Sequence, residues 1–179
     1  MKSKVEAEAF RNPSDRKIVW ITGLPGSGKT TFAKKLVNFA KTDGLLPIFL
    51  DGDELRTALM ISDGFDREKR INLAKTYFNL AILLSNQGYL VVVSTVSMFA
   101  DIFELLSEEI GVFVVLIDAP KKVIFARNQK GLYSGSQPNV PGISLKIQFP
   151  QNPYLKLNGQ ETDQQMSKVI RSLLKDISS

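Results

Sequence analysis

The sequence predicts an α/β domain with a parallel five-stranded sheet and helices on both faces. Short apolar runs alternate along the chain with segments of helical periodicity. The runs are apolar throughout rather than at every second position, which is typical of parallel strands buried on both faces. A helical segment follows each run, and helices are the usual connections between parallel strands.

The apolar runs place the strands, and the periodic segments between them place the helices. Strands are expected over residues 17–22, 46–51, 89–95, 112–118 and, more weakly, 155–157. Helices are expected over residues 29–41, 66–87 and 99–109, from Pro120 onward and after Thr162. Asp66 is a candidate N-cap, and Thr162 with Gln165 fits a capping box.

A chain of 179 residues, 44% of them hydrophobic, is expected to form one domain. We expect this domain to span residues 17–179, after a flexible N-terminal tail at residues 1–16. The alternation breaks over residues 128–153, which hold four Pro and three Gly. Long loops in compact domains are usually functional, so this segment is expected to be a lid. The alternative is a surface loop without a functional role.

Composition excludes several kinds of chemistry. The chain has no Cys and no His, so disulfides, thiolate nucleophiles and the usual transition-metal sites are excluded. A general base at neutral pH is then a carboxylate, a Lys or a Tyr. The net charge of +5 suits an anionic ligand but is too scattered to favour a nucleic acid polymer. Without a signal-peptide pattern or a long apolar run, we expect no membrane association and a cytoplasmic location.

The stretch GLPGSGKT, residues 23–30, matches the phosphate-loop (P-loop) pattern G-x-x-x-x-G-K-[ST] in full. A predicted strand precedes it and a predicted helix follows it, which indicates the P-loop NTPase fold rather than a chance glycine-rich turn. Lys29 is expected to reach the β- and γ-phosphates of ATP, and the Thr30 hydroxyl is expected to hold Mg²⁺. The expected ATP-binding residues are Gly23, Gly26, Ser27, Gly28, Lys29, Thr30 and Thr31.

A second candidate site follows the strand predicted at residues 46–51, in the stretch LDGDELR. In open α/β sheets, ligands bind at the carboxyl ends of the strands. We expect one carboxylate, Asp51, near the metal and the other, Asp53, to accept a proton from an acceptor hydroxyl. Arg56 follows one helical turn later and could hold an anionic acceptor. The alternative is that the two Asp residues flank an ordinary turn.

Further motifs follow in order along the chain: GFDREKR, STVSMF, VLIDAP, RNQKGLY and, more weakly, NPYLKLN. Together with GLPGSGKTT and LDGDELR, these motifs cover residues 18–158 and resemble the adenylylsulfate (APS) kinase family. Members of that family transfer the γ-phosphate of ATP to the ribose 3′-hydroxyl of adenylyl sulfate. The resemblance implies a phosphotransferase with an alcohol acceptor and Mg²⁺ as cofactor. It also suggests a homodimer, because family members are commonly dimers.

The resemblance implies roles for particular residues. It makes Asp53 the base and places Asp51 and Thr30 near the metal, with Lys29 on the ATP phosphates. Arg127 would contact the ATP side. Phe65 would pack on the acceptor base, and Lys130 would belong to the lid. The residues expected to contact the acceptor are Asp53, Arg56, Phe65, Arg70, Ser97, Phe99 and Lys130.

The acceptor half departs from the family pattern, while the ATP half is intact. Leu73 replaces the usual Asn, and residues 97–100 read SMFA where the family has Ser-Pro-Phe-Arg. Either adenylyl sulfate is bound through fewer contacts, or the acceptor is another nucleotide conjugate. Similar enzymes of bacterial polysaccharide pathways phosphorylate cytidine diphosphoramidate, and they share a pattern like QFP at residues 148–150. Cytidine diphosphoramidate is therefore the second candidate acceptor.

One alternative comes from another functional class, and a further one is another kinase of the same fold. A non-catalytic nucleotide-binding module would not need the full set of Lys29, Thr30, Asp51 and Asp53. A small-metabolite kinase of the same fold would not be expected to carry both DGD-x-x-R and GF-x-R-x-x-R, which favour a nucleotide acceptor.

Overall fold

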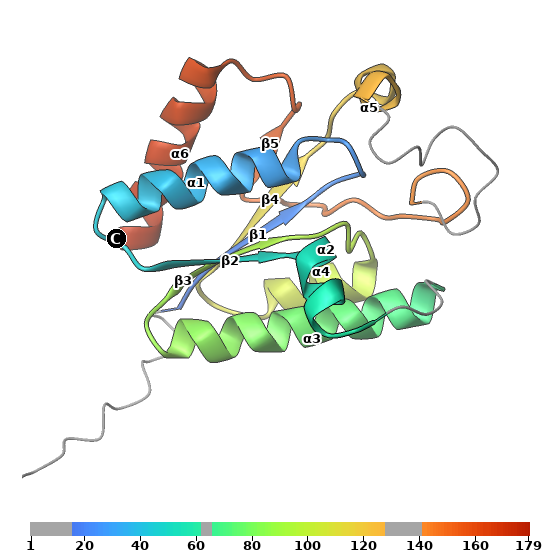
Figure 1. The fold of residues 1–179 in the computed structure, drawn as a ribbon, viewed down its shortest axis with the longest axis horizontal. Helices are drawn as coiled ribbons and strands as arrows, with labels where there is room; N and C mark the ends of the chain where they lie inside the picture. Colours follow the sequence, from blue (N-terminus) through green and yellow to red (C-terminus); the bar gives the residue numbers. More distant parts are fainter. Residues whose placement is uncertain (1–15, 62–65, 128–140) are drawn as a thin grey trace, which may run out of the picture.

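A computed structural model describes residues 16–61, 66–127 and 141–179 of the chain (Figure 1). Its centre is a parallel sheet of five strands in the order β2-β3-β1-β4-β5. The strands are β1 (Lys17–Thr22), β2 (Pro47–Asp51), β3 (Leu90–Ser94), β4 (Val112–Ile117) and β5 (Leu155–Leu157). The predicted α/β class and the parallel five-stranded sheet are confirmed.

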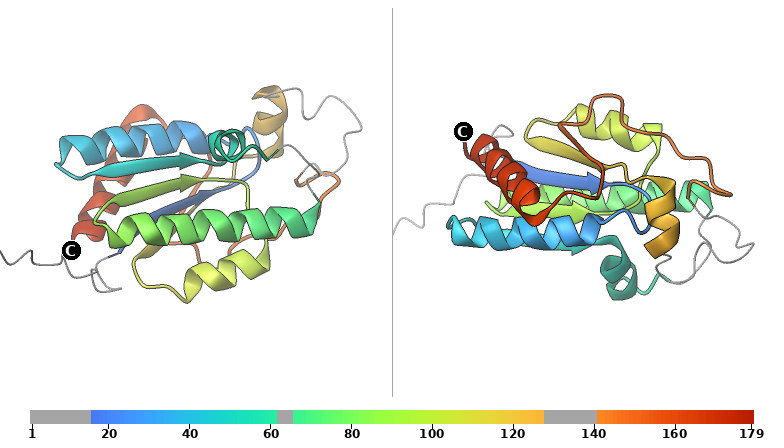
Figure 2. Two further views of the ribbon diagram at one scale, coloured as in Figure 1. Left: turned by 60° about the horizontal axis from the view of Figure 1, so that its bottom comes forward. Right: turned by 90° about the horizontal axis from the view of Figure 1, so that it is seen from above.

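Six helices connect and follow the strands in the described part of the chain. They are α1 (Lys29–Thr42), α2 (Gly52–Ala58), α3 (Arg67–Asn86), α4 (Ala100–Ser107), α5 (Lys121–Arg127) and α6 (Asp163–Ser178). Helices α1 and α6 cover one face of the sheet, whereas α3 and α4 cover the other (Figure 2). The predicted three-layer arrangement is therefore the one observed.

The central strand β1 divides the core into two apolar clusters. Successive side chains of a strand point to opposite faces. Val19 and Ile21 accordingly pack with α1 and α6, while Ile18 and Trp20 pack with α3 and α4. All four are fully buried, which explains why the strand is apolar at every position rather than alternating.

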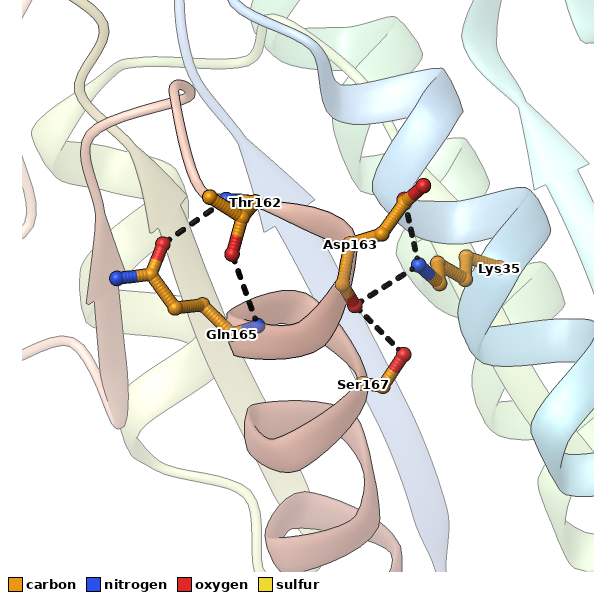
Figure 3. Close-up of polar contacts among 5 residues, drawn as sticks. All are labelled: Lys35, Thr162, Asp163, Gln165 and Ser167. Atoms are coloured by element: carbon orange, nitrogen blue, oxygen red, sulfur yellow. Dashed lines mark hydrogen bonds and ion pairs between the residues drawn. The ribbon is translucent and has the colours of Figure 1, made fainter.

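Two of the helix starts follow from their capping residues. The Asp66 side chain accepts a hydrogen bond from the Lys69 amide at 2.8 Å, and α3 begins directly after it. At α6, the Gln165 amide donates to Thr162 Oγ1 at 3.3 Å, and the Thr162 amide donates to Gln165 Oε1 at 2.9 Å (Figure 3). The predicted capping box is thus present. Lys35 of α1 binds the Asp163 carboxylate at 2.8 Å and ties the two helices together (Figure 3).

Only part of the predicted tail and lid falls within the described residues. Arg16, counted with the flexible tail, is held against the domain: its Nε donates to Asn86 Oδ1 at 3.0 Å, and its guanidinium pairs with Glu109. Of the predicted lid, residues 141–153 are described, and Leu145 packs against the α3 and α4 cluster. No helix in the described ranges has the length and apolar character needed to cross a bilayer.

Candidate active site

The phosphate loop joins β1 to α1 and depends on its glycines. Gly28, the N-cap of α1, has a φ of 107°, which side chains rarely permit. Gly23 lies so close to β4 that a Cβ atom there would be 2.4 Å from the Ile117 carbonyl oxygen. The two residues let the backbone turn sharply between strand and helix, as a loop that presents its N–H groups to phosphate requires.

Lys29 lies inside this loop rather than in solvent. Its side chain is almost fully buried, and its Nζ donates to the Leu24 carbonyl oxygen at 2.9 Å. Burial lowers the pKa of Lys29 to about 8, although the nearby Asp51 carboxylate opposes this shift. Burial thus disfavours the charge of the ammonium group, and a bound anion would favour it.

The first turn of α1 meets the end of β2 through a hydroxyl and a carboxylate. Thr30 Oγ1 donates to Asp51 Oδ2 at 3.0 Å. The other carboxylate oxygen of Asp51 accepts from the Asp53 amide at 2.9 Å and so caps α2. Asp51 is buried, so one side chain fixes the distance between α1 and α2.

These oxygens suit Mg²⁺, which prefers a few hard oxygen ligands together with water and substrate phosphates. Thr30 and Asp51 would hold the ion. Within the described residues, no three acidic side chains gather into a metal cage of their own. The Ser27 hydroxyl in the loop is buried and has no hydrogen-bond partner among the described residues, which is consistent with a loop built for a ligand.

Asp53 lies at the start of α2, half-exposed, at the carboxyl edge of the sheet. Its carboxylate forms an ion pair with Arg56, one turn further along the helix. Arg56 also gives a hydrogen bond to the Tyr77 phenol oxygen. The Tyr77 hydroxyl in turn donates to the Gly52 carbonyl oxygen at 3.2 Å. The two predicted acceptor-site residues, Asp53 and Arg56, are thus brought together.

Tyr77 lies within the helix predicted at residues 66–87, and sequence reasoning gave it no part in the candidate site. A buried Tyr hydroxyl usually needs a hydrogen-bond partner, which is the signal that could have identified it. Arg70 lies near the same group: its pKa is lowered by partial burial and by the positive charge of Arg56. Arg56 and Arg70 therefore place two guanidinium groups where the acceptor is predicted to bind.

The segment after β3 supplies Ser97 and Phe99, and both side chains are buried. The Ser97 and Thr95 hydroxyls are hydrogen-bonded at 2.9 Å. The Phe99 ring packs in the α3 and α4 cluster, with the Arg67 guanidinium 5.5 Å from its centroid. Ser97 and Phe99 thus lie mainly within the core, and their contact with the acceptor stays a prediction. Phe65 and Lys130, the remaining predicted acceptor contacts, lie outside the described residues.

Gln148 joins this segment to the second half of the predicted lid. Its amide donates to the Met98 carbonyl oxygen at 2.9 Å, and its Oε1 accepts from the Ala100 amide at 2.9 Å. Helix α4 has no side-chain cap at Phe99, so Gln148 satisfies one of its free N–H groups from 48 residues away. The sequence pattern marked Gln148 only as part of a motif.

A cavity of about 430 Å³ lies between the phosphate loop and the residues that follow β5. Its lining includes Gly28, Thr31, Arg127, Gly159 and Gln160. The Arg127 guanidinium donates to the carbonyl oxygens of Gly26 and Ser27 at 3.1 and 3.2 Å, and to that of Gly159 at 2.8 Å. Arg127 thus bridges the phosphate loop to the turn after β5, and its contact with ATP stays a prediction.

Sequence reasoning missed the turn at Gly159–Glu161, which forms one wall of this cavity. Asn158 and Gly159 directly follow a short apolar run, and this position at the carboxyl end of a parallel strand is the signal that could have identified them.

The strand–loop–helix unit, with Lys29, Thr30 and a carboxylate at the end of the neighbouring strand, defines a P-loop phosphotransferase. Residues 15–158 match the sequence profile of the adenylylsulphate kinase family. The chain belongs to this family, and it is a phosphotransferase with an alcohol group as acceptor.

Two curated relatives and one solved structure illustrate the likeness. A probable adenylyl-sulfate kinase of Aeropyrum pernix is 35% identical over 150 residues, which cover 79% of this chain and 82% of the relative. A cytidine diphosphoramidate kinase of Campylobacter jejuni is 35% identical over 139 residues, covering 75% and 81%. The Mycobacterium tuberculosis APS kinase CysC, solved in complex with AMPPNP and APS, is 34% identical with a TM-score of 0.81, covering 89% of this chain and 98% of that one.

Proposed function

We propose that this protein transfers the γ-phosphate of ATP to the ribose 3′-hydroxyl of a nucleotide conjugate. The observation that carries the proposal is the hydrogen-bonded series at the carboxyl end of β2. Thr30 binds Asp51, Asp51 binds the Asp53 amide, and Asp53 pairs with Arg56. This series links the phosphate loop directly to a half-exposed carboxylate on the side where an acceptor would bind.

On the donor side, the phosphate loop and Lys29 bind the ATP phosphates, and Thr31 and Arg127 line the cavity beside them. Thr30 and Asp51 hold Mg²⁺. The bound ion offsets the negative charge of the phosphoryl oxygens. In the free protein the Lys29 ammonium binds a loop carbonyl, and we expect it to exchange this partner for phosphate oxygens.

On the acceptor side, Asp53 accepts the proton of the 3′-hydroxyl or orients that hydroxyl toward the γ-phosphate. The Arg56 guanidinium forms an ion pair with the Asp53 carboxylate in the structure. An anionic acceptor competes for the Arg56 guanidinium, and binding it would release Asp53 for the hydroxyl. Arg70 adds a second positive charge for the acceptor. Phe65 and Lys130 complete the proposed acceptor contacts, and residues 128–153 the proposed lid.

Adenylyl sulfate is the first acceptor candidate, because the chain matches the adenylylsulphate kinase family over most of its length. Cytidine diphosphoramidate is the second candidate. It is favoured by the Campylobacter jejuni relative, which is 35% identical, like the Aeropyrum pernix relative. It is also favoured by the changed acceptor half. Leu73 replaces a polar residue there, and Gln148 is hydrogen-bonded to the backbone of Met98 and Ala100, the neighbours of Phe99. A site that loses a polar contact usually loses discrimination for the ligand it served.

The remaining parts of the proposal concern the setting of the reaction. ATP and the nucleotide conjugate are the partners, the protein acts in the cytoplasm, and it forms a homodimer, as the family resemblance suggests.

The test is ADP release by the purified protein with ATP, Mg²⁺ and each acceptor candidate in turn. We expect turnover to depend on the acceptor, and kcat/KM to differ between adenylyl sulfate and cytidine diphosphoramidate. A strong preference identifies the acceptor. The proposal fails when ATP binds but no nucleotide conjugate stimulates its turnover.

A further inference from the structure

Tyr77 lies in the middle of α3 but directs its hydroxyl to α2. Its side chain is 1% exposed, so the polar atom is buried with the ring. The hydroxyl donates to the Gly52 carbonyl oxygen at 3.2 Å and accepts a hydrogen bond from Arg56. These two partners lie on either side of Asp53, one immediately before it and the other one helical turn after it.

Helix α2 is held by few contacts, among them the packing of Leu55 against the α3 and α4 cluster. It has seven residues, and only Gly52 is buried. A short helix is marginal without tertiary contacts. Asp51 caps the start of α2 from β2. Tyr77 adds a second contact at that start and, through Arg56, one contact near the end.

The phenol is suited to this double role. Burial is the main cause that raises the pKa of Tyr77, with Arg56 acting in the opposite direction. The hydroxyl therefore keeps its proton at neutral pH and can donate to Gly52 while its oxygen accepts from Arg56.

We propose that Tyr77 is a positioning residue for Asp53, which it holds in place through the Gly52 carbonyl and the Arg56 guanidinium. The inference rests on the proposed function in that it takes Asp53 as the group that receives the acceptor hydroxyl. Losing the Tyr77 hydroxyl would let α2 move. Misplacement of a reacting group by about 1 Å can cost up to ~100-fold in rate.

The variant Tyr77→Phe removes only the hydroxyl and keeps the ring that packs in the core. We expect kcat to fall roughly tenfold, the equivalent of one hydrogen bond, while KM for ATP stays unchanged. The matched control is Tyr154→Phe. It also removes a Tyr hydroxyl bonded to another residue, Asp176, but lies just before β5, at the amino end of the strand. We expect it to leave kcat unchanged.

Hydrogen–deuterium exchange separates this inference from the proposed function, since it requires no acceptor. Peptides covering α2 should exchange several-fold faster in Tyr77→Phe than in the parent, with α1 unchanged. Faster exchange with unaltered kcat would overturn the positioning role and leave a structural one. Unaltered exchange would overturn the inference outright. An inactive parent would instead reject the proposed function, and exchange would then decide whether Tyr77 holds α2.

Discussion

At the scale of single residues, the proposed chemistry depends on Asp53. It is half-exposed at the edge of the site, and its carboxylate is already paired with Arg56. We expect Asp53→Asn to cut kcat by roughly 10²-fold or more, the usual scale for a positioned base, and to leave ATP affinity nearly unchanged. Steady-state turnover together with calorimetric ATP binding measures both quantities. Turnover close to that of the parent would reject the catalytic role of Asp53.

Lys29 gives the site a pH dependence. Its pKa is lowered to about 8 by burial. Bound phosphate favours the charged form, so the pKa must rise when ATP binds and binding must take up protons. ATP affinity therefore falls as the pH rises above about 8, because the free protein then loses the ammonium charge.

Calorimetry in buffers of different ionisation enthalpy measures this uptake. At pH 8 we expect about half a proton to be taken up per ATP, since half of the free Lys29 is deprotonated when pH equals pKa. Lys29→Met binds ATP more weakly and lacks this uptake. Equal proton uptake in Lys29→Met and the parent would assign it to another group.

At the scale of elements, the turn after β5 forms one wall of the cavity beside the phosphate loop. Gly159 has a φ of 70°, and a Cβ atom there would lie 2.5 Å from the Ser27 carbonyl oxygen in the phosphate loop. We expect Gly159→Ala to displace the loop or the turn and to weaken ATP binding about tenfold, equivalent to ~1.4 kcal/mol.

Gly44→Ala is the matched control. Gly44 has a φ of 78°, but nothing lies within 4 Å of the Cβ position. Both variants should lose about 1–2 kcal/mol of unfolding free energy for the left-handed backbone, and only Gly159→Ala should also lose ATP affinity. Equal ATP affinity in the two variants would show that the close approach at Gly159 does not matter for binding.

Helix α4 and the segment before it depend on Gln148. We expect Gln148→Leu to raise KM for the acceptor several-fold, because the Ala100 amide loses its partner and the segment holding Ser97 loosens. KM for ATP should stay unchanged. Gln148→Glu keeps an oxygen that accepts from Ala100 and should behave like the parent. Equal acceptor KM values in Gln148→Leu and Gln148→Glu would contradict this role.

The elements themselves were predictable because their signals are local. The apolar runs located all five strands to within one residue at either end, and Asp66 and Thr162 marked the helix starts. The contacts of Tyr77 and Gln148 were not predictable. Each joins residues that lie far apart in the chain, 25 residues for Tyr77 and Gly52, so no local pattern records it.

At the scale of the whole molecule, the strand order explains why the site could be predicted in part. Because the strands are parallel, their carboxyl ends share one edge, and the segments that follow β1, β2 and β3 meet there. The general rule thus brings Thr30, Asp51 and Asp53 together. The rule does not say which groups meet across that edge, such as the Arg127 guanidinium and the Gly159 carbonyl oxygen.

The changed acceptor half is also a property of the whole molecule. The phosphate loop matches its sequence pattern in full, while the proposed acceptor side includes contacts of Tyr77 and Gln148 that the motifs did not predict. The sequence profile thus supports the family assignment over residues 15–158, whereas the acceptor residues leave two candidate acceptors, adenylyl sulfate and cytidine diphosphoramidate.

The central claim is that phosphate moves from ATP to a ribose 3′-hydroxyl. The most direct measurement follows the product of the better acceptor by mass spectrometry and ³¹P NMR, next to the same acceptor lacking its 3′-hydroxyl. We expect one added phosphate at the 3′ position and no product from the 3′-deoxy compound. A phosphorylated product from the 3′-deoxy compound, or ADP release without any phosphorylated nucleotide, would contradict the claim.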